Sequence, residues 1–142
     1  CTAIQHRLNV LNPADEMLTL CEKNDLASIN KSPLNSAFLT GKIHKDYVFE
    51  NEDGRKGMDL ESKPLQQRLT QVEALRDVLT SNGRTMAQGA LAWIWAYSNR
   101  TIPIPGFKSV KQVTKNAKAM EFGPLTKPQM EEITTIMTGK YE

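Results

Sequence analysis

Apolar residues recur at three- and four-residue steps along much of the chain, which is the spacing of one face of an α-helix. One helix is expected from about Ser62 to Asn82-Gly83, with the apolar positions Leu65, Leu69, Val72, Leu75 and Leu79. Another is expected from the N-cap Asn12 to about Asn24, because Pro13 and two acidic residues follow the cap. Each pattern leaves a polar side, so both helices should cover a core on one face only.

Three capping boxes mark further helix starts, since each places a hydroxyl residue three positions before a glutamine. They are Thr85 with Gln88, Ser109 with Gln112, and Thr126 with Gln129. The helix after Thr85 is apolar on most sides and includes Trp93 and Trp95, so it should be deeply buried and its tryptophans should belong to the core. The two later helices should each have about a dozen residues.

Short runs of strand type at residues 2–5, 26–30 and 101–104 alternate with these helices. The alternation predicts an α/β fold in which about three strands pair in parallel and about five helices accompany them. Such a sheet would be incomplete, because parallel sheets need both faces covered and both edges paired. The polar segment from His44 to Lys63 is expected to be a long mobile loop.

The length of 142 residues and the 39% hydrophobic content fit one globular domain. A net charge of +2 argues against a dedicated nucleic-acid binder, which would carry a strong basic excess. No apolar run approaches the roughly 20 residues that cross a bilayer. Cys1 and Cys21 are too few for a disulfide framework and suggest a reducing cytosol. Because the chain opens at Cys1 inside an expected strand, we expect it to be part of a longer protein.

Two loops that follow expected strands carry residues suited to phosphate binding. The first spans residues 101–116, where a Pro-Gly turn leads into the helix capped by Ser109 and lysines add positive charge. Free backbone N–H groups and the helix dipole make this terminus a ready anion site. The alternative is that Ser109 and Gln112 only cap the helix while the nearby lysines are solvated.

The second loop runs from Ser32 to Lys42 and supplies hydroxyls, backbone donors and one lysine, all suited to a pyrophosphate. It is not a Walker loop, because the Gly-x4-Gly-Lys-Ser/Thr spacing is absent. The alternative is a surface turn with a solvated Lys42. No metal site is expected, since His6 and His44 have no cysteine or acidic residue at ligand spacing. His6 is expected instead to be a hydrogen-bonded residue near a strand end.

A set of motifs follows a fixed order along nearly the whole chain. They are Thr2-Ala3-Ile4-Gln5, Leu8-Asn9, Ser32-Pro33-Leu34, Phe38-Leu39-Thr40-Gly41-Lys42, Thr85-x-Ala87-Gln88-x-Ala90-Leu91-Ala92-Trp93, Ile102-Pro-Ile-Pro-Gly106, Gln112-x-x-x-Asn116-Ala117 and Leu125-Thr126. Together they resemble the C-terminal half of an aldo-keto reductase, and most closely its longer bacterial members. That family has a (β/α)8 TIM barrel of about 250 residues. The resemblance therefore implies a partial barrel containing strands six to eight.

The resemblance also divides the single domain at residues 1–142. Residues 1–43 would hold strand, helix, strand and pyrophosphate loop, residues 44–63 the mobile loop, and residues 64–142 the remaining helices, the last strand and the 2′-phosphate loop. The catalytic tetrad of the family (Asp, Tyr, Lys and His) belongs to the other half, so no catalytic residue is assigned. Tyr47, Tyr97 and Tyr141 do not match the catalytic tyrosine motif.

By the same resemblance, this half binds the cofactor. Gln5 would contact the nicotinamide carboxamide, and Lys31 stands where the family places an aromatic or Arg side chain against the nicotinamide ring. The pyrophosphate loop would use Ser32, Leu34, Ser36, Thr40 and Lys42. The adenosine and 2′-phosphate clamp would use Gly106, Phe107, Lys108, Ser109, Gln112 and Asn116. Because Gln112 replaces a frequent Arg, we expect NADP(H) with NAD(H) as an alternative, and Lys108 would supply the missing charge.

The resemblance implies that the intact protein is a cytoplasmic, NADP(H)-dependent reductase of aldehydes or ketones, with a small carbonyl substrate and no nucleic-acid or membrane partner. This chain alone is expected to be inactive, because it lacks the proton donor. One alternative is a non-catalytic, nicotinamide-nucleotide-binding subunit of regulatory or channel-associated type, and another is a structural half-barrel without cofactor affinity. Exposed strand edges and apolar interior imply that the fragment self-associates or needs its N-terminal half.

Overall fold

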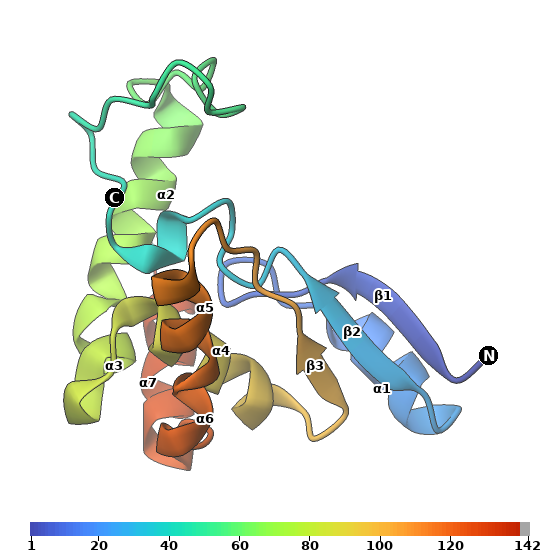
Figure 1. Cartoon of the computed structure of the whole chain (residues 1–142). Helices are drawn as coiled ribbons and strands as arrows, with labels where there is room; N and C mark the ends of the chain where they lie inside the picture. The colour runs from blue at the N-terminus through green and yellow to red at the C-terminus, as the bar shows by residue number, and fades with distance from the viewer. Residues whose placement is uncertain (140–142) are drawn as a thin grey trace.

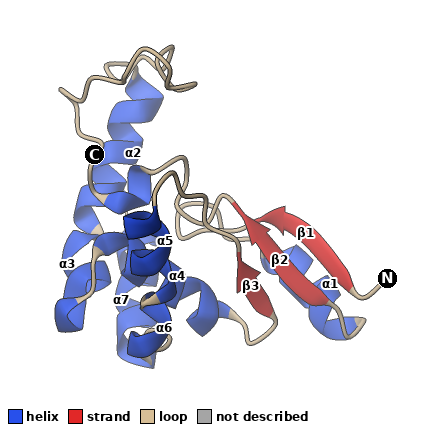
Figure 2. Ribbon diagram, viewed as in Figure 1, coloured by secondary structure: helices blue, strands red, loops and turns tan. Residues whose placement is uncertain are grey.

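The computed structural model describes residues 1–139, and a three-stranded parallel sheet lies at one side of it (Figures 1 and 2). The strands are β1 (Ala3–Arg7), β2 (Ala27–Lys31) and β3 (Thr101–Pro103), in the order β1-β2-β3. In the register His6 lies opposite Asn30, and Asn30 lies opposite Pro103. The three strands expected from the sequence are confirmed, with ends shifted by one or two residues.

Seven α-helices and two 3-10 turns accompany the sheet over residues 1–139. They are α1 (Asp15–Lys23), η1 (Phe38–Thr40), α2 (Lys63–Ala74), α3 (Arg76–Thr80), η2 (Ser81–Gly83), α4 (Met86–Tyr97), α5 (Val110–Ala117), α6 (Ala119–Phe122) and α7 (Lys127–Thr138). Figure 1 shows α4 between the sheet on one side and α2, α3 and α7 on the other. No helix within the described residues is long and apolar enough to cross a membrane.

Helix α4 is the centre of the core, as its composition predicts. Every residue from Gln88 to Ile94 is buried, and the capping box of Thr85 and Gln88 is formed in both directions. Trp93 is 4% exposed, whereas Trp95 is only partly buried. A Cβ at Gly89 would lie 1.9 Å from the Leu79 carbonyl oxygen, so only glycine permits the close approach of α3 to α4.

Three local predictions are wrong, each at a helix boundary. The N-cap of α1 is Ala14, because Asn12 pairs with Asn9 through its backbone instead. The helix expected from residue 62 to 82 breaks at Leu75, which is fully buried and has a ψ of −9°. The helix after Ser109 likewise divides at Lys118 into α5 and α6. These two divisions turn the expected five helices into seven.

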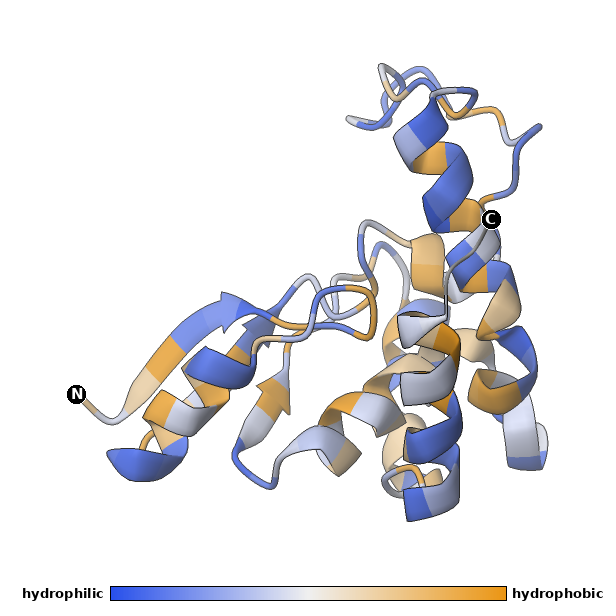
Figure 3. Cartoon of the chain, turned by 180° about the vertical axis from the view of Figure 1, so that it is seen from behind, coloured by the Kyte–Doolittle hydropathy of each residue, from blue (hydrophilic) through white to orange (hydrophobic). Residues whose placement is uncertain are grey.

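The segment of residues 44–62 has no helix or strand, as predicted, and consists of consecutive turns. Figure 3 shows it as mostly hydrophilic, with short apolar stretches. Two of its apolar residues, Phe49 and Leu60, are nonetheless buried in the main core at 8% and 7% exposure. The segment is therefore attached to the body by apolar contacts, and its mobility stays a prediction.

Candidate functional site

The loops that follow β1, β2 and β3 meet at one edge of the sheet, because the three strands are parallel and their carboxyl ends coincide (Figure 1). The side-chain Nδ2 of Asn9, after β1, donates to the Ser32 carbonyl, after β2, at 2.9 Å. The backbone N–H of Ile104, after β3, donates to the Asn30 carbonyl at 3.1 Å. Loops distant in sequence thus form one surface, which is where barrel enzymes carry their sites.

A cluster of buried asparagines fixes the loop after β2. Asn9 is fully buried, and its Oδ1 accepts hydrogen bonds from the Leu11 backbone N–H at 3.1 Å and from Asn35 Nδ2 at 3.3 Å. The same Asn35 Nδ2 donates to Asn12 Oδ1 at 3.0 Å. The motif Leu8-Asn9 marked one of these residues in the sequence, but nothing there showed that Asn35 completes the cluster.

The loop after β2 contains a run of left-handed residues. Asn35, Ser36 and Ala37 have φ values of 46°, 53° and 70°, which side-chain-bearing residues rarely adopt. The Phe38 N–H donates to the Asn35 carbonyl at 3.1 Å, closing a turn around them. Within residues 1–139, the backbone N–H groups of Ser36 and Ala37 have no hydrogen-bond acceptor. Neighbouring free backbone N–H groups in a turn are a common arrangement for binding anions.

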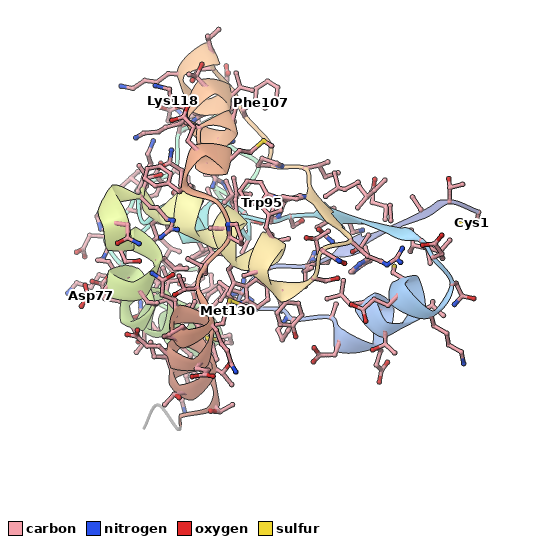
Figure 4. The ribbon with its side chains drawn as sticks, turned by 90° about the horizontal axis from the view of Figure 1, so that it is seen from below. Cys1, Asp77, Trp95, Phe107, Lys118 and Met130 are labelled. Carbon is pink, nitrogen blue, oxygen red and sulfur yellow. The ribbon has the colours of Figure 1, made fainter. Side chains whose placement is uncertain are left out.

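The loop before α5 has the predicted cap with one difference. Ser109 Oγ accepts a hydrogen bond from the Gln112 backbone N–H at 3.2 Å, so Ser109 is the N-cap as expected. The Gln112 Oε1, however, accepts from the Lys108 backbone N–H at 2.5 Å rather than from Ser109. The side-chain oxygen of Gln112 therefore stabilises the loop before α5, and its Nε2 is left to donate elsewhere. Phe107 beside α5 is 60% exposed, well away from Met130 on α7 (Figure 4).

The segment of residues 44–62 connects these two loops through two ion pairs of Asp53, one with Arg55 and one with Lys108. Arg55 Nη1 donates to the Ser36 carbonyl at 2.7 Å, and its Nε donates to Asp53 Oδ1 at 2.8 Å. The Arg55 side-chain and backbone donors hold the pKa of the Asp53 carboxyl well below its usual range. Lys108 Nζ lies 4.0 Å from Asp53 Oδ2. Sequence reasoning placed Asp53 and Arg55 in this loop but missed them as site residues, because charged loop residues are usually solvated.

The two faces of the sheet differ in how deeply their side chains are buried. His6, Ser28 and Asn30 lie buried on one face, where Ser28 Oγ is 2.7 Å from His6 Nε2 and accepts from Asn30 Nδ2 at 2.8 Å. His6 is thus hydrogen-bonded near a strand end, as expected. Gln5 and Lys31 lie on the opposite face and are exposed.

The other predicted residues divide into exposed and supporting groups. The exposed residues are Ser32, Ser36, Lys42, Gly106, Phe107, Lys108, Ser109 and Gln112. Leu34 packs against the core, and Thr40 Oγ1 donates to the Ala37 carbonyl at 2.7 Å, so both support the loop after β2. Asn116 is half-buried on α5. The cofactor roles of all these residues stay predictions.

No group of three or more His, Cys, Asp or Glu side chains gathers within residues 1–139 at metal-binding separation. The Tyr97 hydroxyl donates to Asp15, and burial together with this carboxylate raises the Tyr97 pKa. Tyr97 therefore joins α4 to α1. Tyr47 packs edge-on against Phe49, and Tyr141 lies outside the described residues.

Comparison with known proteins gives a consistent family. A sequence profile described as "Aldo/keto reductase family" matches residues 1–138. The chain is 29% identical over 115 residues to "Aldo-keto reductase yakc [NADP(+)]" of Schizosaccharomyces pombe, covering 80% of this chain and 34% of that protein. It is 29% identical over 133 residues to "Probable voltage-gated potassium channel subunit beta" of Oryza sativa subsp. japonica, covering 88% of this chain and 39% of that protein.

A solved structure supports the fold. The glycerol dehydrogenase from Gluconobacter oxydans superposes with a TM-score of 0.80 at 22% identity, covering 95% of this chain and 42% of that one. The fold is therefore a partial TIM barrel. The chain spans between 34% and 42% of the length of these three proteins.

Proposed function

The chain belongs to the aldo/keto reductase family, and on that premise we propose that it is the cofactor-binding, C-terminal half of an NADP(H)-dependent reductase of aldehydes and ketones. The observation that carries the proposal is the pair of free backbone N–H groups at Ser36 and Ala37, which face no acceptor within residues 1–139. Two adjacent donors in a left-handed turn suit a pyrophosphate oxygen. The relative from Schizosaccharomyces pombe, whose name includes NADP(+), supports this choice of cofactor.

The residues of the chain divide the work of holding such a cofactor. The exposed face of β1 and β2 carries Gln5 and Lys31, which would take the nicotinamide end. The loop after β2 would hold the pyrophosphate, and the N-terminus of α5 with Lys108 and Ser109 would hold the adenosine end. When bound, the nicotinamide supplies the hydride that reduces a carbonyl group to an alcohol. This chain positions the cofactor and, by resemblance, leaves the proton donor to the other half.

The proposal is tested by titrating NADPH into the purified chain and following tryptophan fluorescence. Saturable binding without oxidation of NADPH by added aldehydes is the expected result. A test variant, Lys108→Met, removes the positive charge at the adenosine end and should weaken the binding of NADPH. Failure of NADPH to bind the wild-type chain contradicts the proposal, as would aldehyde reduction that persists unchanged through purification.

A second candidate is a non-catalytic nicotinamide-nucleotide-binding subunit, which the similarity to the rice potassium channel subunit favours. Both candidates predict cofactor binding by this chain. They differ in the remaining part of the protein, where an enzyme needs the Asp, Tyr, Lys and His tetrad and a subunit without activity does not. The sequence upstream of Cys1 distinguishes them directly. We place the protein in the cytoplasm in either case, in keeping with its free cysteines.

A further inference from the structure

Asp53 lies between the two loops that would hold the phosphates of the cofactor. Its side chain is only 12% exposed, because Arg55 binds it and in turn attaches to the Ser36 carbonyl. Lys108 approaches the same carboxylate, since its Nζ lies 4.0 Å from Oδ2, the oxygen that also accepts from Arg55 Nη2. Lys108 is the more exposed partner, since 77% of its side chain is accessible to solvent.

The two cationic side chains beside the Asp53 carboxylate differ in how many hydrogen bonds hold them. Arg55 makes two hydrogen bonds to Asp53, from Nε at 2.8 Å and from Nη2 at 2.5 Å, and a third to Ser36 at 2.7 Å. Each nitrogen of the guanidinium therefore donates one hydrogen bond to Asp53 or Ser36. Lys108 has one long ion pair and remains able to turn toward an incoming anion. Asp53 is ionised at neutral pH, and the donors of Arg55 hold its pKa below the ordinary carboxyl range.

Gln112 adds no charge at the adenosine end. Its Oε1 accepts from the Lys108 backbone N–H, so only a neutral Nε2 donor is left for a ligand. A 2′-phosphate must then obtain its charged partner from lysine. Lys108 is the lysine that forms an ion pair with Asp53.

We propose that Asp53 is a specificity-determining residue, whose carboxylate competes with a 2′-phosphate for Lys108 and so lowers the preference of the site for NADP(H) over NAD(H). The inference rests on the proposed function. A 2′-phosphate carries close to two negative charges, and a fixed carboxylate beside its lysine weakens their attraction. A ribose 2′-hydroxyl suffers no such repulsion and can donate a hydrogen bond to a carboxylate. Asp53 therefore disfavours one cofactor without disfavouring the other.

Two adenosine nucleotides test this without catalysis. Adenosine 2′,5′-bisphosphate and adenosine 5′-monophosphate differ only by the 2′-phosphate, and their dissociation constants for the full chain are measured by calorimetry at low salt. Asp53→Asn is expected to raise the affinity ratio of bisphosphate to monophosphate about fivefold. The matched control is Glu52→Gln, which removes a neighbouring exposed carboxylate that has no ion pair among residues 1–139. It should leave the ratio within about twofold.

A second variant separates charge from loosening of the loop. Arg55→Gln also detaches the segment from Ser36, but it leaves the Asp53 carboxylate free to pair with Lys108, so the ratio should fall. A rise in the ratio with Arg55→Gln would mean that loop release, not charge, controls selectivity, and would overturn the inference. An unchanged ratio in Asp53→Asn, with both nucleotides still bound, overturns the inference alone. If neither nucleotide binds the wild-type chain, the proposed function fails as well.

Discussion

Gln88 and Lys115 are joined by a hydrogen bond from the side-chain Nε2 of Gln88 on α4 to the backbone carbonyl of Lys115 on α5, at 2.9 Å. The Oε1 of the same side chain accepts from the Thr85 backbone N–H, also at 2.9 Å, and so completes the capping box. One amide thus caps α4 and attaches it to the helix that follows the proposed phosphate loop. A glutamate would complete the box equally well but has no donor for Lys115.

Gln88→Glu is therefore expected to lower the free energy of unfolding by about 2 kcal/mol, because a buried carboxylate would face a carbonyl oxygen. Gln88 is only 5% exposed, so water cannot relieve the repulsion. The matched control is Gln129→Glu in the other complete capping box. Gln129 Nε2 donates to the Ser81 hydroxyl at 2.7 Å, and this hydroxyl, which now donates to the Val78 carbonyl, can turn to donate to a glutamate instead. Urea denaturation followed by circular dichroism should show a clearly smaller loss for Gln129→Glu, and equal losses would contradict this reading.

Gly89→Ala should be the more damaging of two glycine substitutions. The added Cβ would lie 1.9 Å from the Leu79 carbonyl oxygen, so α3 and α4 must separate and open the core. We expect a loss of about 3 kcal/mol or more in the free energy of unfolding. Gly57→Ala, where an added Cβ meets nothing within 4 Å, should change stability by less than about 1 kcal/mol. Thermal denaturation of both variants measures the difference, and a wild-type melting temperature for Gly89→Ala would refute the predicted clash.

Ala37→Gly should stabilise the chain. Ala37 has a φ of 70°, a left-handed conformation that costs an alanine about 1 to 2 kcal/mol and a glycine almost nothing. After subtraction of the greater unfolded-state entropy of glycine, a gain of up to about 1 kcal/mol remains. Ala117→Gly, in exposed helix α5, should have the opposite sign and lose about 1 kcal/mol. Chemical denaturation of the pair checks both signs, and a loss of stability with Ala37→Gly would show that the left-handed turn is not strained.

Tyr97 should make stability depend on pH in the alkaline range. Its pKa is raised in the folded state by burial and by the hydrogen bond to Asp15, so the folded chain holds the phenol proton more tightly than the unfolded chain. This contribution is complete below the ordinary tyrosine pKa of about 10 and is lost as pH rises through the folded pKa. Tyr97→Phe should remove part of the decline above pH 10, measured by urea midpoints at several pH values. An identical decline in both proteins would exclude Tyr97 as its source.

The purified chain should self-associate unless a complementary barrel segment is present. Strands β1 and β3 each have one paired edge in the sheet, and Val110 and Met120 are 80% and 73% exposed on α5 and α6. Unpaired edges and apolar surface favour association. Light scattering should give a mass above 15.9 kDa that decreases in Met120→Glu. The control Val48→Glu replaces another exposed apolar residue, in the segment of residues 44–62, and should not change the mass. A monomeric wild-type chain at micromolar concentration would contradict the prediction.

Local sequence patterns predicted the helices and strands better than the residues at which helices begin or break. The capping boxes at Thr85 and Thr126 are formed as expected, because a cap depends on residues three positions apart. The break at Leu75 was not predicted, because the apolar spacing continues through it. Asn12 was assigned as a cap from its neighbours, whereas its side chain pairs with Asn35, 23 residues away. A contact of that kind leaves no periodic signal.

The sequence by itself determined the alternation of strands and helices, the burial of α4 and the family motifs, because hydrophobic spacing and capping are local properties of the chain. Only the tertiary structure decided which polar residues meet at the sheet edge. It brought Asp53 and Arg55 from a loop of consecutive turns to Ser36 and Lys108, and it placed the side-chain oxygen of Gln112 against the Lys108 backbone N–H. These contacts depend on how the three parallel strands align their carboxyl ends, which is a property of the packed sheet and not of any one segment.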